Sequence, residues 1–236
     1  MLRRLVPTLL TGLLAAAVAY AQAPEAFTVQ TSAGPLTLRP IKHATVLLQF
    51  KGKSYYLDPA QVPAAGLPKA DAILVTHEHG DHCDPKLVQE LRKDGTVIIA
   101  SGSAAAKLTG AQVMKNGDHR KVLDADVEAV PAYNIVRKQF HPKGRDNGYI
   151  LTFGGKRIYF AGDTEGTPEM KALKNIDVAF LPINLPYTMP PAEAAEAARA
   201  FMPKLLVPYH QGQSNPQEVA DALKGTKIEV KVLKLP

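Results

Sequence analysis

Short apolar runs, each bounded by glycine, proline or charged residues, recur along the chain and predict strands. Residues 44–50 (ATVLLQF) and 54–59 (SYYLDP) flank a Lys-Gly-Lys turn, which is typical of a β-hairpin. The unbroken apolar run 72–76 predicts a buried strand. Residues 148–164 predict two strands joined by a Gly-Gly pair, a strong hairpin signal. The first half of the chain therefore favours locally paired strands.

Later strands alternate with helices. Further strands are predicted at 96–101, 127–133, 177–183, 204–210 and 228–235. Helices are predicted at 85–95, 103–108, 168–173, 192–201 and 216–224. The first of these helices begins with Asp84 as N-cap and Pro85 as first helical residue, and Gly95 is expected to end it. This order predicts an α/β (α+β) fold in which helices cover mixed sheets.

The length of 236 residues and the 46% share of hydrophobic residues allow one sizeable core. We find no repeat at a fixed period and no Ser/Gly-rich linker. We therefore expect one domain after a separate N-terminal segment.

That segment has the pattern of a secretory signal peptide. Arg3 and Arg4 precede the apolar stretch 5–18, and Ala19-Tyr20-Ala21 fits a cleavage site, with Ala23 as the second choice. We expect residues 1–21 to be removed and residues 24–236 to form a periplasmic or secreted domain. The alternative is an uncleaved membrane anchor, which the short apolar stretch disfavours.

Charge changes this picture little. The net charge of +6 falls to +4 when Arg3 and Arg4 are removed, and the remaining basic residues are scattered along the chain. This argues against a nucleic-acid partner and leaves a small-molecule substrate as the expected partner, with the oligomeric state open. Cys83 is the only cysteine, so no internal disulfide forms, and we expect it to be a buried thiol.

Candidate metal ligands crowd the end of the predicted strand 72–76. The sequence HEHGDH supplies His77, His79, Asp81 and His82 within six residues. If this backbone is extended, alternation sends both His77 and His79 to one side, and Gly80 then allows a tight turn. Four ligands so close together suit two neighbouring zinc ions better than one tetrahedral ion.

Other residues at predicted strand ends and loops supply further candidates. His141 precedes a turn-rich segment, Asp163 follows one predicted strand, and His210 ends another. His119 lies in a polar turn and is expected to be a surface residue. Thr76, Asp58 or Thr164 are candidates to orient the ligating imidazoles.

The pattern H-x-H-x-D-H, then a histidine, an aspartate in GDT and a histidine after a strand resembles the metallo-β-lactamase fold superfamily. KHATVLLQFKGKSYYLDP and AGDTEGTPEM resemble its broad group of bacterial metal-dependent hydrolases, and the similarity runs over about residues 41–212. The resemblance implies a four-layer αββα sandwich of two mixed sheets flanked by helices, with the site at one edge.

The resemblance also implies roles for the candidate ligands. One zinc would be held by His77, His79 and His141. A second would be held by Asp81, His82 and His210. Asp163 would bridge both, with a hydroxide between the ions as nucleophile. Mn²⁺ or Fe²⁺ are alternatives to zinc. Oxygen-reducing di-iron relatives have glutamate at the position of His79, so this histidine argues for hydrolysis.

Three residues are candidates for catalysis. Asp81 would orient the nucleophile and transfer its proton. His43 precedes a strand, where it either faces the substrate or has a structural role. Tyr187, in a proline-flanked loop, either donates a hydrogen bond to an oxyanion or packs against its neighbours.

These features predict an exported binuclear zinc hydrolase of a small ester, lactone or phosphoester. One alternative is a phosphodiesterase, for which Lys143 and Arg145 beside His141 would bind phosphate. The other is a non-catalytic protein stabilised by metal. The substrate loops typical of antibiotic-degrading members are not recognisable, which argues against β-lactamase activity.

Overall fold

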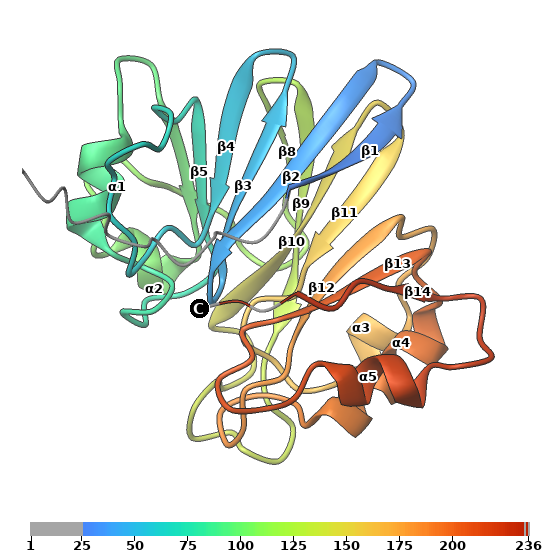
Figure 1. Ribbon diagram of the computed structural model, residues 1–236. Coiled ribbons are helices and arrows are strands. Elements are labelled where there is room, and N and C mark those ends of the chain that lie inside the picture. The colour runs from blue at the N-terminus through green and yellow to red at the C-terminus, as the bar shows by residue number, and fades with distance from the viewer. Residues whose placement is uncertain (1–25, 234, 236) are drawn as a thin grey trace, which may run out of the picture.

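The computed structural model describes residues 26–233 and 235, which form two seven-stranded β-sheets packed face to face (Figure 1). The predicted signal peptide, residues 1–21, lies outside the described residues. The first sheet has the strand order β1 (Phe27–Thr31), β2 (Gly34–Lys42), β3 (Thr45–Phe50), β4 (Lys53–Leu57), β5 (Ala72–Val75), β6 (Val97–Ala100) and β7 (Gln112–Val113).

The second sheet has the same arrangement, with seven strands that neighbour one another in the order of the sequence. Its strand order is β14 (Glu229–Val230), β13 (Leu205–Tyr209), β12 (Val178–Pro182), β11 (Lys156–Phe160), β10 (Asp146–Phe153), β9 (Ala125–Ala132) and β8 (His119–Val122). In each sheet, four sequential strands pair antiparallel and the remaining pairs are parallel. Both sheets are therefore mixed, as predicted.

Helices cover the outer face of each sheet. Figure 1 shows α1 (Pro85–Leu91) and α2 (Gly102–Ala105) beside the first sheet, and α3 (Pro168–Lys171), α4 (Pro191–Phe201) and α5 (Gln217–Ala222) beside the second. The layers are helix, sheet, sheet and helix, so the predicted αββα sandwich is confirmed.

Three buried clusters join these layers. The largest fills the space between the sheets, where Leu38 and Leu48 of the first sheet belong to the same cluster as Phe153 and Phe180 of the second. A second cluster packs α4 and α5 on one sheet, and a third packs α1 on the other. Apolar area removed from water at these three contacts supplies the main stabilisation of the sandwich.

Several element ends differ from the prediction. The first helix begins at Pro85 with Asp84 as N-cap, as predicted, but it ends at Leu91, and Gly95 lies in the turn that follows. The predicted closing strand 228–235 pairs with β13 only over Glu229–Val230. β1 and β2 were not among the predicted elements, although they continue the first antiparallel set.

Five connections converge at one edge of the sandwich. They follow β5, β9, β11, β12 and β13, and they carry the loops in which the candidate ligands were predicted. This placement is usual for sites in α/β architectures. No helix within residues 26–233 and 235 has the length and apolar character needed to cross a membrane.

Candidate metal centre

The structure brings all seven predicted ligands to this edge of the sandwich. Loop 76–82 after β5 carries four of them, and the other three come from the loop between β9 and β10, from the end of β11 and from the end of β13. In sequence order they are His77, His79, Asp81, His82, His141, Asp163 and His210. Except for His79 and Asp81, these side chains are buried.

The carboxylate of Asp163 lies at the middle of the cluster. Its Oδ1 atom is 3.2 Å from Nε2 of His82 and 3.3 Å from Nε2 of His210. Its Oδ2 atom is 3.3 Å from Nε2 of His141 and 4.0 Å from Nε2 of His77. The two oxygens therefore face two different groups of histidines.

Each side of Asp163 is completed by nearby donors. His77, His79 and His141 place one ring nitrogen each within 4.8 Å of one another. On the other side, Oδ2 of Asp81 lies 3.4 Å from Nε2 of His210 and 4.0 Å from Nε2 of His82.

His43 joins this second group. Its Nε2 is 3.2 Å from Oδ2 of Asp81, and its ring centroid is 3.8 Å from that of His210. His43, Asp81 and His210 also satisfy the 4.8 Å spacing of a possible metal-binding triad. His43 therefore contacts the candidate ligands and also lines the cleft, so the substrate-facing and the structural role both stay open.

Several buried polar atoms in the cluster have no hydrogen-bond partner among the described residues. Burying such atoms without a partner costs free energy, roughly 1–3 kcal/mol each. The unpartnered atoms of the cluster are Nε2 of His77, Nε2 of His82, both ring nitrogens of His210, and Oδ1 of Asp163. Imidazole nitrogens and carboxylate oxygens are zinc ligands, so this donor set fits a metal centre.

Asp58 and Thr76 support the histidines from behind. Asp58 accepts hydrogen bonds from the backbone N–H and the hydroxyl of Thr76 at 2.7 and 2.8 Å, and its Oδ2 lies 2.8 Å from Nδ1 of His82. Oγ1 of Thr76 is 3.0 Å from Nδ1 of His77. These contacts at Nδ1 direct the Nε2 atoms of His77 and His82 into the cluster. Thr164, the third candidate, bonds instead to the backbone of Tyr133 and Glu165.

Asp146 supports His141 in the same way and was missed from the sequence. Its Oδ2 lies 3.3 Å from Nδ1 of His141, and Arg145 pairs with the same carboxylate at 2.9 Å. Asp146 begins β10, and its position five residues after His141 carries no motif. A charged residue at the start of a strand whose side chains are nearly all buried was the available signal.

The two acidic residues of the centre are ionised. Burial alone would raise the pKa of Asp163, but His210 and His82 hold it well below the usual value. Burial also opposes ionisation of Asp81, and its contacts with His210 and His43 outweigh that effect and lower the pKa.

The histidines divide into two sets. Burial lowers the pKa of His77, His79 and His210, which favours the neutral imidazole that binds metals. Burial acts in the same direction on His82 and His141, but neighbouring carboxylates outweigh it. They hold the pKa of His82 well above its usual value and raise that of His141 to about 9. These carboxylates thus favour protonation of the two imidazoles, and a proton on the ligating nitrogen competes with metal binding.

A cleft of about 530 Å³ opens onto the cluster. Ten residues line it: His43, Gln61, His79, Asp81, Phe140, His141, Asp163, Asn184, Tyr187 and His210. Asp81 is 31% exposed here, so a ligand in the cleft reaches its carboxylate. The ring of Tyr187 packs edge-on against Phe140 with ring centroids 5.0 Å apart, and the side chain remains 46% exposed at the cleft.

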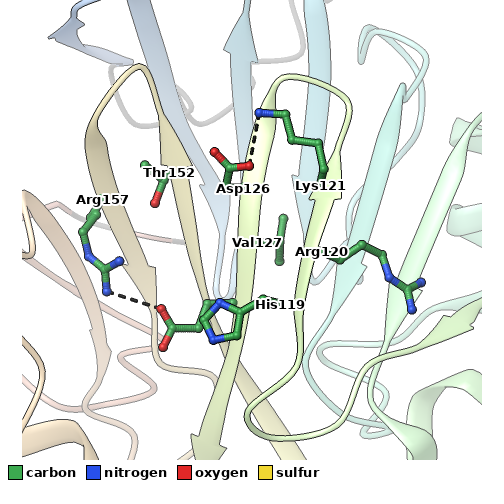
Figure 2. Close-up of a pocket in the computed structure, with 8 residues that line it drawn as sticks. His119, Arg120, Lys121, Asp126, Val127, Thr152 and Arg157 are labelled. Carbon is green, nitrogen blue, oxygen red and sulfur yellow. Dashed lines mark hydrogen bonds and ion pairs between the residues drawn. The ribbon is translucent and has the colours of Figure 1, made fainter.

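His119 lies far along the second sheet, in a separate shallow pocket shown in Figure 2. It is exposed on β8, as predicted. Two ion pairs, Lys121–Asp126 and Arg157–Glu128, lie in this pocket, and Arg120 donates a hydrogen bond to Gln112. Cys83 is buried against α1 and the first sheet, which confirms the prediction of a packed thiol.

Comparison with known proteins agrees with this fold and cluster. Residues 37–210 match the family model of the beta-lactamase superfamily domain. A UPF0173 metal-dependent hydrolase of Geobacillus thermodenitrificans is 34% identical over 187 residues, 71% of this chain and 82% of the relative. A UPF0173 metal-dependent hydrolase of Thermococcus kodakarensis is 33% identical over 81% of this chain and 93% of its own.

Solved structures give the same result. A crystal structure from Parabacteroides distasonis, provisionally described as a metal-dependent hydrolase, is 47% identical with a TM-score of 0.88 and covers 90% of this chain and 100% of that one. Igni18, a metallo hydrolase from Ignicoccus hospitalis, is 25% identical with a TM-score of 0.68, covering 85% and 95% of the two chains.

The fold and its histidine-rich cleft define a metal-dependent hydrolase of the metallo-β-lactamase fold. The chain belongs to the β-lactamase superfamily, and the predicted family, fold and enzyme class are confirmed.

Proposed function

We propose that this protein is a binuclear zinc hydrolase that cleaves a small ester, lactone or phosphoester. The observation that carries the proposal is the position of Asp163, whose two oxygens face different groups of histidines. A carboxylate with this surrounding is suited to bridge two ions, whereas one ion would leave half of the donors without a role.

The first ion would be held by His77, His79 and His141, and the second by Asp81, His82 and His210. The unpartnered ring nitrogens support this assignment, because a bound cation would satisfy them. When bound, two divalent ions lower the pKa of a water molecule between them to about 7 and polarise the substrate oxygen under attack.

Asp81 and His43 have complementary tasks in this scheme. The carboxylate of Asp81 lines the cleft and would accept the proton that the attacking water loses. Nε2 of His43 contacts the same oxygen at 3.2 Å and fixes its orientation. A contact made before substrate binds requires no reorganisation during the reaction.

We also propose that the protein is exported, with residues 1–21 as its signal peptide. The charged start, apolar stretch and small residues at 19–21 support this. N-terminal sequencing of the protein from fractionated cells tests it: a chain that begins at Gln22 or Pro24 in the periplasm or medium is expected. An intact Met1 in the cytoplasmic fraction contradicts export.

Metal analysis followed by hydrolase assays tests the main proposal. The purified protein should contain about two zinc ions per chain and cleave activated esters or phosphoesters. Asp163→Asn should lose both metal and activity while retaining the fold by circular dichroism. Full turnover in a metal-free preparation would contradict the proposal, as would a metal-loaded protein that cleaves no ester, lactone or phosphoester.

A further inference from the structure

Apart from four histidines, the side chains that line the cleft are uncharged or acidic. Among the described residues, no lysine or arginine lines it. Gln61 and Asn184 contribute uncharged amides, and Asp81 and Asp163 contribute the acidic groups. Apart from these histidines, positive charge in this cleft would therefore come from the metal ions.

The cations nearest in sequence to His141 are engaged elsewhere. Lys143 contacts Glu169 at 2.8 Å and the hydroxyl of Tyr133 at 3.2 Å. Arg145 pairs with Asp146 at 2.9 Å and with Glu78 at 3.4 Å. Proteins commonly bind phosphate groups with arginine or lysine side chains, and these two are not positioned to do so in the cleft. The support that the sequence offered for a phosphodiesterase is thereby removed.

An aromatic wall occupies one side of the cleft instead. Phe140 and Tyr187 line it and pack against each other with ring centroids 5.0 Å apart. Exposed apolar side chains stand on the same two loops: Ile135 is 41% exposed, Val136 78% and Leu185 44%. Aromatic side chains that line a cleft, such as Phe140 and Tyr187, are typical of ligand-binding sites.

These loops are held in place by buried polar contacts. The amide of Asn134 donates to the carbonyl of Tyr187 at 2.7 Å and so joins the two loops. Glu165, two residues after Asp163, accepts hydrogen bonds from the backbone N–H groups of Ile135 and Val136, each at 2.7 Å. The wall is therefore a fixed part of the site, and a ligand need not order it.

We propose that the cleft selects uncharged carbonyl substrates, esters or lactones, whose apolar group packs against Phe140 and Tyr187, in preference to phosphoesters and other anions. The inference rests on the proposed function and narrows its substrate class. In the reaction, the oxygen of water bonds to the carbonyl carbon, the bond from that carbon to the alcohol oxygen breaks, and a proton from the water passes to the leaving alkoxide. The products are a carboxylic acid and an alcohol.

Three substrates with the same leaving group test the inference: p-nitrophenyl butyrate, p-nitrophenyl hemisuccinate and bis(p-nitrophenyl) phosphate. With zinc-loaded protein, kcat/KM for the butyrate should exceed that for each anionic substrate by about tenfold or more, because the wall contacts the apolar chain of the butyrate and no lysine or arginine lines the cleft to pair with an additional negative charge. Equal or faster cleavage of either anion would overturn the inference and leave the proposed function standing. If zinc-loaded protein cleaves none of the three and no lactone, the proposed function fails and the inference fails with it.

Variants of the wall test its role separately. Tyr187→Ala and Phe140→Ala should each lower kcat/KM for p-nitrophenyl octanoate about tenfold. The same variants should change kcat/KM for p-nitrophenyl acetate by about twofold or less, because only the longer acyl chain reaches the wall. Tyr187→Phe keeps the aromatic ring, so kcat/KM for the octanoate should fall less in this variant than in Tyr187→Ala. Val113→Ala, an exposed apolar change on β7, is the matched control. If Tyr187→Ala reduces acetate and octanoate equally, Tyr187 acts on the reacting group and the wall assignment is wrong.

Discussion

The carboxylate of Asp58 lies 2.8 Å from Nδ1 of His82, although 24 residues separate them in the sequence. Asp58 is buried at the end of β4 and does not line the cleft. Its backbone is in the left-handed region, with φ at +45°, a conformation that is costly for a non-glycine residue. The fold thus holds Asp58 in a strained backbone position from which it fixes one candidate ligand.

Replacement of this carboxylate should weaken the second metal position. In Asp58→Asn, we expect zinc affinity to fall roughly 10–100-fold at that position, because the orienting partner of His82 loses its charge. Competition with a zinc chelator measures the affinity. Asp126→Asn, which changes an exposed aspartate on β9, is the matched control. Unchanged affinity in Asp58→Asn would show that the contact does not orient a ligand.

Single-ligand variants should separate the two ions. His141→Asn removes a donor from one side of Asp163, and His210→Asn removes one from the other side. Each variant should retain about one zinc ion per chain and lose hydrolysis by at least about a hundredfold. Elemental analysis measures the content, with His119→Asn as the control that keeps both ions. Loss of both ions from both variants would contradict two separate positions.

Gly212 should be essential for the loop that carries His210. It has φ at +53°, and a Cβ atom there would overlap the side-chain amide of Asn184. Gly225 also has positive φ, at +80°, but a Cβ atom there meets nothing within 4 Å. Gly225→Ala should therefore cost only the backbone strain, about 1–2 kcal/mol in the free energy of unfolding.

Gly212→Ala should lower the free energy of unfolding by more than Gly225→Ala does, and it should also displace Asn184 or His210. We expect reduced zinc affinity and activity in that variant and neither change in Gly225→Ala. Urea unfolding and zinc titration of the two variants measure both effects. Equal behaviour of the two variants would mean that the contact with Asn184 is unimportant.

Asp177 should contribute to stability in a pH-dependent way. Burial alone would raise its pKa, but Lys204, the backbone N–H of Arg157 and Lys156 outweigh that effect and lower it below the usual 3.8. A carboxyl with a lowered pKa stabilises the fold above its unfolded value, and this stabilisation is lost as the pH falls through the folded value.

The matching experiment compares wild type with Asp177→Asn in EDTA-treated protein. At pH 7 the variant should be less stable by about 1–2 kcal/mol, and the difference should shrink below about pH 3.8. Urea unfolding across this range provides the measurement. A difference that is constant with pH would show that the ionised form of Asp177 is not the stabilising species.

Local patterns predicted much of the fold because they depend on neighbouring residues. The Gly154-Gly155 pair marked the β10–β11 hairpin, and Asp84-Pro85 marked the start of α1. The alternating pattern of 228–235 misled, since only Glu229–Val230 pairs with a neighbouring strand.

The clustering of the candidate ligands was predictable because the motif places four of them together, and the other three stand at predicted strand ends or in a loop, where the resemblance also implies ligands. What the sequence did not contain are contacts that only the fold creates. The support of His82 by Asp58 was only one of several options, and that of His141 by Asp146 was missed. Lys143 and Arg145 looked available for phosphate until their partners Glu169 and Asp146 were seen.

Anomalous diffraction at the zinc absorption edge, from crystals grown with zinc, tests the central claim most directly. We predict two peaks in the cleft, one among His77, His79 and His141 and the other among Asp81, His82 and His210, with Asp163 between them. A single peak, or none within reach of Asp163, would contradict the binuclear centre.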